Sequence, residues 1–338
     1  MSHVLKLSPL ANIGIFMNNA KFKPLISLLL IFIAAPLLSA LLTPWIYQAI
    51  QSQSAQVMEW VHTCEEAGTH TFWADIADSV FTSPFRRVND RVVLILILLF
   101  LPISYRLSGL RSLDSLGWPR RPDRLKLFAG ALGVAMASML AVYLLGVALG
   151  VYAWDGASLP AAQLTAGILK ILLGGLLIGI LEETLFRGVI LNAFSTGLGR
   201  VAGILITSIL FAVIHFIKPA EPEVLNQWYS GLLLYQHPFS GASGTVGIEM
   251  STLLCMGLVL GALTSWTKSV YVAIGLHTGW VWVMMLFRLL TENQQTMVWL
   301  YGTSEWISTG WVGPIMALMI LAAAFVTRKK WIALGNVE

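Results

Sequence analysis

The chain has 338 residues, of which 57% are hydrophobic and 11% are charged, and its formal net charge at pH 7 is +4. A soluble domain carries about 25% charged residues, and here the apolar residues also fall in long runs, so a soluble globular protein is excluded. A run of about 18 or more apolar residues crosses the roughly 30 Å hydrocarbon core of a bilayer as a helix. The basic residues cluster at the ends of these runs, which is typical of membrane topology and not of nucleic-acid binding. We therefore expect an integral membrane protein that binds the lipid bilayer and no nucleic acid.

The apolar runs predict an all-α, polytopic transmembrane helix bundle with about eight spans. In chain order, the spans are expected at about 24–46, 90–105, 127–152, 164–181, 201–217, 249–266, 269–290 and 307–327. The apolar stretch 184–198 is expected to be a helix that packs against the bundle without a separate crossing. Segments 51–89 and 218–247 are expected to be loops, the second with a short interfacial helix. Gly257 and Gly261 have the GxxxG spacing that allows two helices to approach closely.

The distribution of Lys and Arg predicts the orientation of these spans. Segment 106–126 is rich in basic residues, namely Arg106, Arg111, Arg120, Arg121, Arg124 and Lys126, and both chain ends add further lysines and arginines. Segment 51–89 is instead rich in acids. Because basic loops stay on the cytoplasmic side, we expect a multi-pass protein of the plasma (inner) membrane with both termini cytoplasmic.

No repeat of fixed period and no low-complexity linker divides the chain. We interpret residues 1–126 as an N-terminal membrane extension with two spans and a basic cytoplasmic loop. Residues 127–338 are then the functional core, with its motifs within 164–285. Cys64, in a polar loop, and Cys255, in an apolar run, predict neither a disulfide framework nor a CxxC metal site.

Three clusters of ionisable residues lie within or at the ends of spans. Such residues are costly in a bilayer and are functional candidates by default. The first cluster holds the adjacent acids Glu182 and Glu183, with Arg187 after them. The other two are His215, near the end of the fifth predicted span, and His277, inside the seventh.

Helical geometry separates the two acids. Glu183 and Arg187 are four residues apart and share one helix face, so they can form an ion pair. Glu182 is rotated by about 100° from Glu183 and is not on the face of Arg187. Glu183 is therefore predicted to be neutralised and structural, which leaves Glu182 to act as a general base toward water.

Two chemistries are compatible with these residues. His215 and His277 can polarise a scissile carbonyl, stabilise an oxyanion or protonate a leaving amine. Alternatively, Glu182 and both histidines can ligate a divalent metal such as zinc, leaving a position open for water. The sequence leaves open whether the cofactor is a metal or none.

The order EExxxR, FxxxH and a later histidine resembles the CAAX prenyl protease and bacteriocin-processing family of intramembrane proteases. Here the motifs begin with Glu182-Glu183, run from Phe211 to His215, and end with His277. The resemblance covers about 164–285.

The family resemblance implies an intramembrane endopeptidase that hydrolyses a peptide bond in a membrane-associated protein or peptide. By that resemblance Glu182 activates water, and His215 and His277 complete the site. Glu183, Arg187 and Phe211 support them. The family includes members discussed as metalloproteases and as glutamic-type proteases, so it implies no choice between the two.

One departure from the family pattern favours a second hypothesis. The last motif usually has Asn or Asp four residues after the final histidine, and this chain has Val281 there, with Asn192 as one conceivable substitute. A catalytically silent relative that acts as an immunity or scaffold membrane protein is therefore the alternative. A secondary transporter is a third hypothesis, because intramembrane Glu and His also build proton relays, but no inverted repeat is visible.

Overall fold

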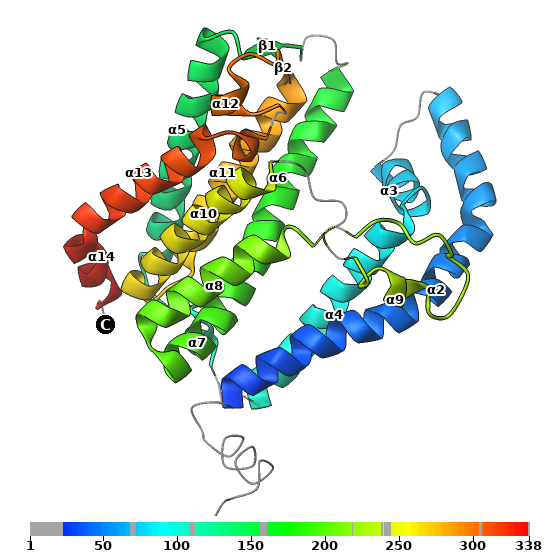
Figure 1. Cartoon of the computed structure of the whole chain (residues 1–338). Coiled ribbons are helices and arrows are strands. Elements are labelled where there is room, and N and C mark those ends of the chain that lie inside the picture. The colour runs from blue at the N-terminus through cyan, green and yellow to red at the C-terminus, as the bar shows by residue number, and fades with distance from the viewer. Residues whose placement is uncertain are drawn as a thin grey trace, which may run out of the picture. The chain divides into compact units, whose positions relative to one another are not determined.

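The computed structural model of the protein describes residues 23–67, 72–107, 112–155, 161–217, 219–237, 239, 245–303 and 306–336. Figure 1 shows that these residues are mainly helical, as predicted. The expected features at residues 1–22 and at Arg111 lie outside them. The described chain forms two compact units. The first consists of the described residues of Met1–Leu25, Gly109–Phe216 and Ser243–Glu338, and the second of those of Ile26–Ser108 and Ile217–Ala242.

The second unit corrects the loop predicted at 51–89. It contains the helices α2 (Lys23–Glu66), α3 (Phe72–Phe81), α4 (Phe85–Leu107) and α9 (Ser230–Leu233). Helix α2 continues far beyond the predicted span, so Cys64 lies in a helix and not in a loop. The residues after 46 are polar but rich in Gln, Ala, Met and Glu, which are good helix formers. Polarity there marks the surface of a helix and not its end.

A buried amide joins three segments of the second unit. The Asn89 side chain, which is 3% exposed, accepts hydrogen bonds from Ser39 and Thr43 at 3.1 Å each. Its amide nitrogen donates to the Tyr235 hydroxyl at 3.2 Å. This network ties α2 and α4 to the segment after α9. A short helix was expected within 218–247, and α9 is one.

The first unit is a bundle of longer helices with a small two-stranded antiparallel sheet at one end. Its helices are α5 (Arg124–Ala148), α6 (Ala161–Glu183), η3 (Thr184–Ile190), α7 (Leu191–Leu198), α8 (Arg200–Ile214), α10 (Val246–Thr267), α11 (Tyr271–Leu290), α13 (Val312–Val326) and α14 (Arg328–Gly335). Shorter elements are η1 (Leu113–Leu116), α12 (Val298–Tyr301), η4 (Ile307–Thr309) and the strands β1 (Tyr152–Trp154) and β2 (Thr291–Asn293). The strands pair antiparallel, with Ala153 opposite Glu292.

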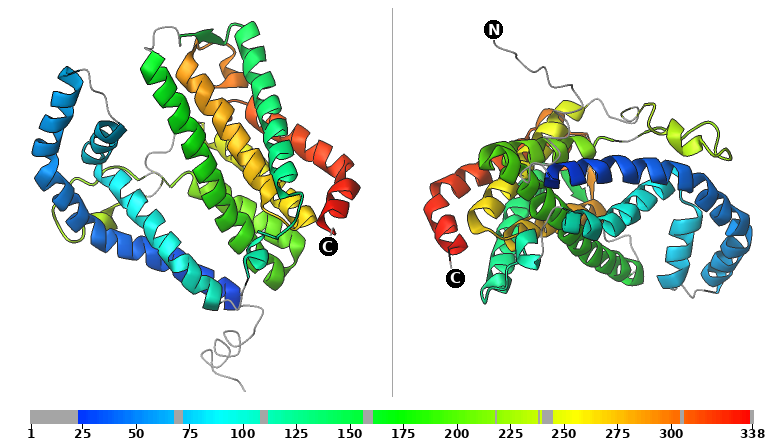
Figure 2. Two further views of the ribbon diagram at one scale, coloured as in Figure 1. Left: turned by 180° about the vertical axis from the view of Figure 1, so that it is seen from behind. Right: turned by 90° about the horizontal axis from the view of Figure 1, so that it is seen from below.

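Helix α11 lies at the centre of this unit. It packs against α5, α6 and α10, and Figure 2 shows it between α5 and α6 in the view from behind. The core is apolar and draws mainly on α5, α10 and α11. Within it the rings of Tyr143 and Phe287 stack with their centroids 4.4 Å apart. The position of a functional side chain on α11 is therefore fixed by packing against three other helices.

The polytopic all-α class is confirmed, with fewer evident crossings than the predicted eight. Among the described residues, five helices are long and apolar enough to cross a membrane, or six if α13 and α14, bent by 69°, form one span. The five are Phe32–Cys64, Arg124–Ala148, Leu164–Leu198, Val246–Thr267 and Tyr271–Leu290. The run predicted at 201–217 forms α8, whose 15 residues extend only about 22 Å. The helix expected at 184–198 makes no separate crossing, because it continues from α6 through η3 into α7 as part of Leu164–Leu198.

Gly275 allows α11 and α5 to approach closely. A Cβ atom at Gly275 would lie 3.0 Å from the Ala131 Cβ and inside van der Waals contact of the Phe128 carbonyl oxygen. We expect Gly275→Ala to lower the free energy of unfolding by about 1–3 kcal/mol, because backbone of α5 must move. Denaturant titration of the purified protein in detergent measures this. The matched control is Gly133→Ala on α5, where a Cβ meets nothing within 4 Å; an equal loss there would contradict the explanation.

Candidate active site

The two adjacent acids lie where α6 changes its helical form. Glu182 and Glu183 end α6, and the π-helical turn η3 follows with Phe186–Ile190 all buried. Turns of this kind occur mostly inside α-helices and frequently at functional sites. Gly188 faces η1 so closely that a Cβ would overlap the Leu116 carbonyl oxygen. The glycine that ends the EExxxRG sequence is thus required by packing.

Glu183 is the centre of a buried charged cluster. Its Oε1 lies 3.2 Å from Nη1 of Arg187, and its Oε2 lies 3.2 Å from Nε of the same guanidinium. Both side chains are 0% exposed. The ion pair predicted from the spacing is therefore present.

His277 belongs to this cluster, because it forms its hydrogen bond with Glu183 and not with Glu182. Its Nδ1 lies 2.8 Å from Oε1 of Glu183. Because a carboxylate oxygen only accepts, the proton is on Nδ1, and Nε2 is the atom left for other chemistry. The sequence grouped His277 with Glu182 and missed its partnership with Glu183.

Glu182 faces His215 at the end of α8. Oε2 of Glu182 lies 3.8 Å from Nε2 of His215, and the two side chains are about one-third exposed. Nδ1 of His215 lies 2.7 Å from the Phe211 carbonyl oxygen, which only accepts, so this nitrogen carries a proton and Nε2 turns toward Glu182. Oε2 of Glu182 has no hydrogen-bond partner among the described residues. This oxygen atom is itself buried.

The Phe211 ring lies at the junction of both pairs. Its centroid is 4.6 Å from the His215 ring and 6.2 Å from the His277 ring. The Arg187 Cζ lies 4.5 Å from the same centroid, a cation–π distance, and Phe186 contacts the ring edge to face. The phenylalanine of FxxxH therefore spaces the two histidines and covers the guanidinium.

Contacts between distant segments complete the site and were not visible in the sequence. The Trp118 indole donates to the Thr184 hydroxyl at 3.2 Å. Asn192 donates to the Ser115 carbonyl at 2.9 Å, so its amide is used at η1. A Cβ at Gly175 would lie 3.2 Å from a methyl group of Val281, which therefore packs against α6.

The structure does not form the metal site that the sequence analysis gave as one of two possibilities. Within the described ranges, no group of three or more His, Cys, Asp and Glu side chains is placed to hold a metal ion. Glu182, His215 and His277 therefore do not form such a group in this arrangement.

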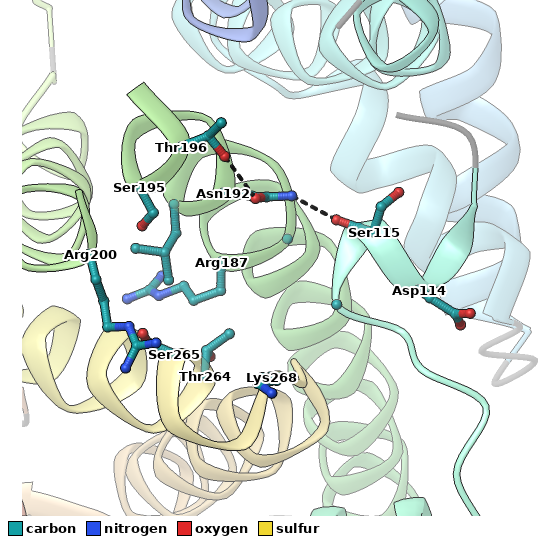
Figure 3. A pocket seen from close by; sticks show the side chains of 13 residues that line it. Asp114, Ser115, Arg187, Asn192, Ser195, Thr196, Arg200, Thr264, Ser265 and Lys268 are labelled. Atoms are coloured by element: carbon teal, nitrogen blue, oxygen red, sulfur yellow. Dashed lines mark hydrogen bonds between the residues drawn. The ribbon is translucent and has the colours of Figure 1, made fainter. Parts of the chain in front are cut away.

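A polar cavity of ≈ 500 Å³ adjoins the charged cluster on the side of Arg187 (Figure 3). Segments η1, η3, α7 and α10 contribute to its lining, whereas Glu182, His215 and His277 do not line it. Arg187 is therefore shared between the buried cluster and this cavity.

Apolar helices long enough to span a bilayer, together with a buried Glu–Arg–His cluster and a half-buried Glu–His pair, indicate a multi-pass membrane protein with a polar centre among its helices. Residues 163–283 match the family described as type II CAAX prenyl endopeptidase Rce1-like. The match contains every residue of the centre and confirms the resemblance of this segment to that family. No curated protein and no solved structure matches the chain.

Proposed function

We propose that the protein is an intramembrane endopeptidase that hydrolyses a peptide bond in a membrane-associated protein or peptide. The observation that carries the proposal is that the two adjacent glutamates have different surroundings. Glu183 is held by Arg187 and His277, whereas Glu182 is partly exposed and faces Nε2 of His215 at 3.8 Å. A carboxylate with a free oxygen beside an imidazole is the arrangement that general-base activation of water needs.

In the first step a water molecule between Glu182 and His215 attacks the scissile carbonyl carbon. An O–H bond of the water breaks and its proton moves to the Glu182 carboxylate, while the new C–O bond forms. His215 orients the water through Nε2, because its Nδ1 is occupied by the Phe211 carbonyl. General-base catalysis of this kind contributes about 10²–10⁴-fold to a rate.

The second step returns the proton to the leaving group. The C–N bond breaks, the nitrogen takes the proton from Glu182, and the carboxylate is regenerated. His277 is held by Glu183 at Nδ1, as an aspartate holds the histidine of a Ser-His-Asp triad. An imidazole held in this way can carry a proton on Nε2 and donate it to the oxyanion.

A catalytically silent relative is the second candidate, and Val281 favours it. At the position where the family usually has a polar side chain, this chain has an apolar one packed toward Gly175. A protein without turnover can still act as an immunity or scaffold protein through its membrane surface.

One experiment separates the two candidates. Cells carrying the wild-type protein and cells carrying Glu182→Gln are grown at matched expression, and peptide termini in their membrane proteomes are read by mass spectrometry. We expect a precursor to accumulate in the variant and a terminus present in wild-type cells to disappear.

The matched control for this experiment is Glu292→Gln, which removes the same charge from an exposed position in β2. It is expected to give the wild-type termini. Identical termini in all three strains, under growth conditions that require the protein, would favour the silent relative and overturn the peptidase.

A further inference from the structure

We propose that the cavity beside Arg187 binds a phosphate-bearing anion, with a phospholipid headgroup as its source. This proposal concerns binding and does not depend on the proposed peptidase activity. The cavity volume of ≈ 500 Å³ is within the range of small-molecule sites.

Arg187 has unused hydrogen-bonding capacity at this cavity. The residue is 2% exposed and lines the cavity. Its Nη1 and Nε face Glu183, whereas Nη2 has no hydrogen-bond partner in the described part of the chain. A buried donor without a partner costs free energy, and a bound ion or water molecule that accepts its proton removes that cost.

Thr264 of α10 presents a buried hydroxyl to the same cavity. The residue is 6% exposed and lines the cavity. No residue that the structure describes makes a hydrogen bond with its Oγ1. An oxyanion beside Thr264 and Arg187 would accept hydrogen bonds from both, because each can donate.

The charge around the cavity is mainly positive. Arg200 at the start of α8 and Lys268 just after α10 line it, and the charge of neither is balanced by an ion pair among the described residues. Lys268 donates to the Asn336 side chain, which is neutral and leaves the lysine charge in place. Figure 3 shows Arg187, Arg200 and Lys268 on one side, whereas Asp114 lies at the other edge with its carboxylate pointing away.

The location of the cavity favours a lipid as the source of the phosphate. It lies at the ends of apolar helices, where α8 begins and where α10 ends and α11 follows. Lipid phosphates are concentrated at that level of a bilayer, and basic pockets between transmembrane helices bind anionic headgroups. Serine and threonine side chains, among them Ser195 and Ser265, provide further donors to phosphate oxygens.

The test measures binding by thermal unfolding of the full-length protein in neutral detergent. The probes are dioleoylphosphatidylglycerol, dioleoylphosphatidylcholine, inorganic phosphate and a short peptide with a free C-terminal carboxylate. We expect the phosphatidylglycerol to raise the unfolding midpoint in a saturable way and the phosphatidylcholine to have a much smaller effect.

Two variants localise the site. Arg200→Gln removes one cavity cation, and Thr264→Val removes the buried hydroxyl, and each is expected to weaken the phosphatidylglycerol affinity about tenfold. Lys126→Gln is the control, because it removes an exposed cation outside the cavity lining. Arg187 itself is not varied, because its loss would also disturb Glu183.

Each outcome supports or overturns the phosphate site. Equal midpoint shifts with both lipids, or unchanged affinity in Arg200→Gln and Thr264→Val, would overturn the proposal. A shift with the carboxylate peptide and with neither phosphate probe would also overturn it. Saturation by inorganic phosphate, lost in both variants, would support the phosphate site and identify free phosphate as its source.

Discussion

Glu182→Gln and His215→Gln are each expected to lower the rate of peptide cleavage by about 10²–10⁴-fold. The double variant is expected to be no slower than the slower of the two single variants, because groups that act on one water molecule are not additive. The measurement is kcat on the substrate found by the terminus comparison, with the protein purified in detergent.

Both changes should leave the fold intact, because the two side chains are about one-third exposed. Equal unfolding midpoints for wild-type and variant proteins are the check on this. A double variant whose loss equals the product of the two single losses would show that Glu182 and His215 act in separate steps.

Arg187→Met is expected to lower the free energy of unfolding by about 3–5 kcal/mol, because it leaves the Glu183 carboxylate buried without its guanidinium. Adding Glu183→Gln to this variant should restore part of the loss, since the buried charge is then removed as well. Denaturant unfolding of the purified protein measures both.

The matched control for Arg187→Met is Arg328→Met, which removes an exposed guanidinium from α14. A surface change of this kind is expected to remain within about 0.5 kcal/mol of wild type. If Arg187→Met were no less stable than this control, the guanidinium would not be what stabilises the charge on Glu183.

The parts of the site that are local in sequence were predictable. The spacing of Glu183 and Arg187 follows from helical geometry, and it distinguished the ion-paired Glu183 from Glu182. The partnership of His277 with Glu183 was not predictable, because it depends on how α11 packs against α6. Helical periodicity says which residues share a face, and not which face of another helix they meet.

The fold was predictable in class and less so in its boundaries. Apolar runs predict the bundle, but they do not predict the polar continuation of α2 to Glu66, since polarity does not distinguish an exposed helix from a loop. The π-helical turn after Glu183 has no composition signal of its own. It joins the segments predicted at 164–181 and 184–198 into one helix, Leu164–Leu198.

The length of that helix bears on the depth at which a peptide would meet the Glu182 carboxylate. Its 35 residues extend about 52 Å, whereas the hydrocarbon core is about 30 Å thick. Glu182 is 18 residues beyond Leu164, or about 27 Å along the axis. With the Leu164 end at one margin of the hydrocarbon, Glu182 reaches the opposite margin, where water is abundant. The bond to be cut would then be presented at headgroup level, and a substrate segment would not have to unwind at the bilayer centre.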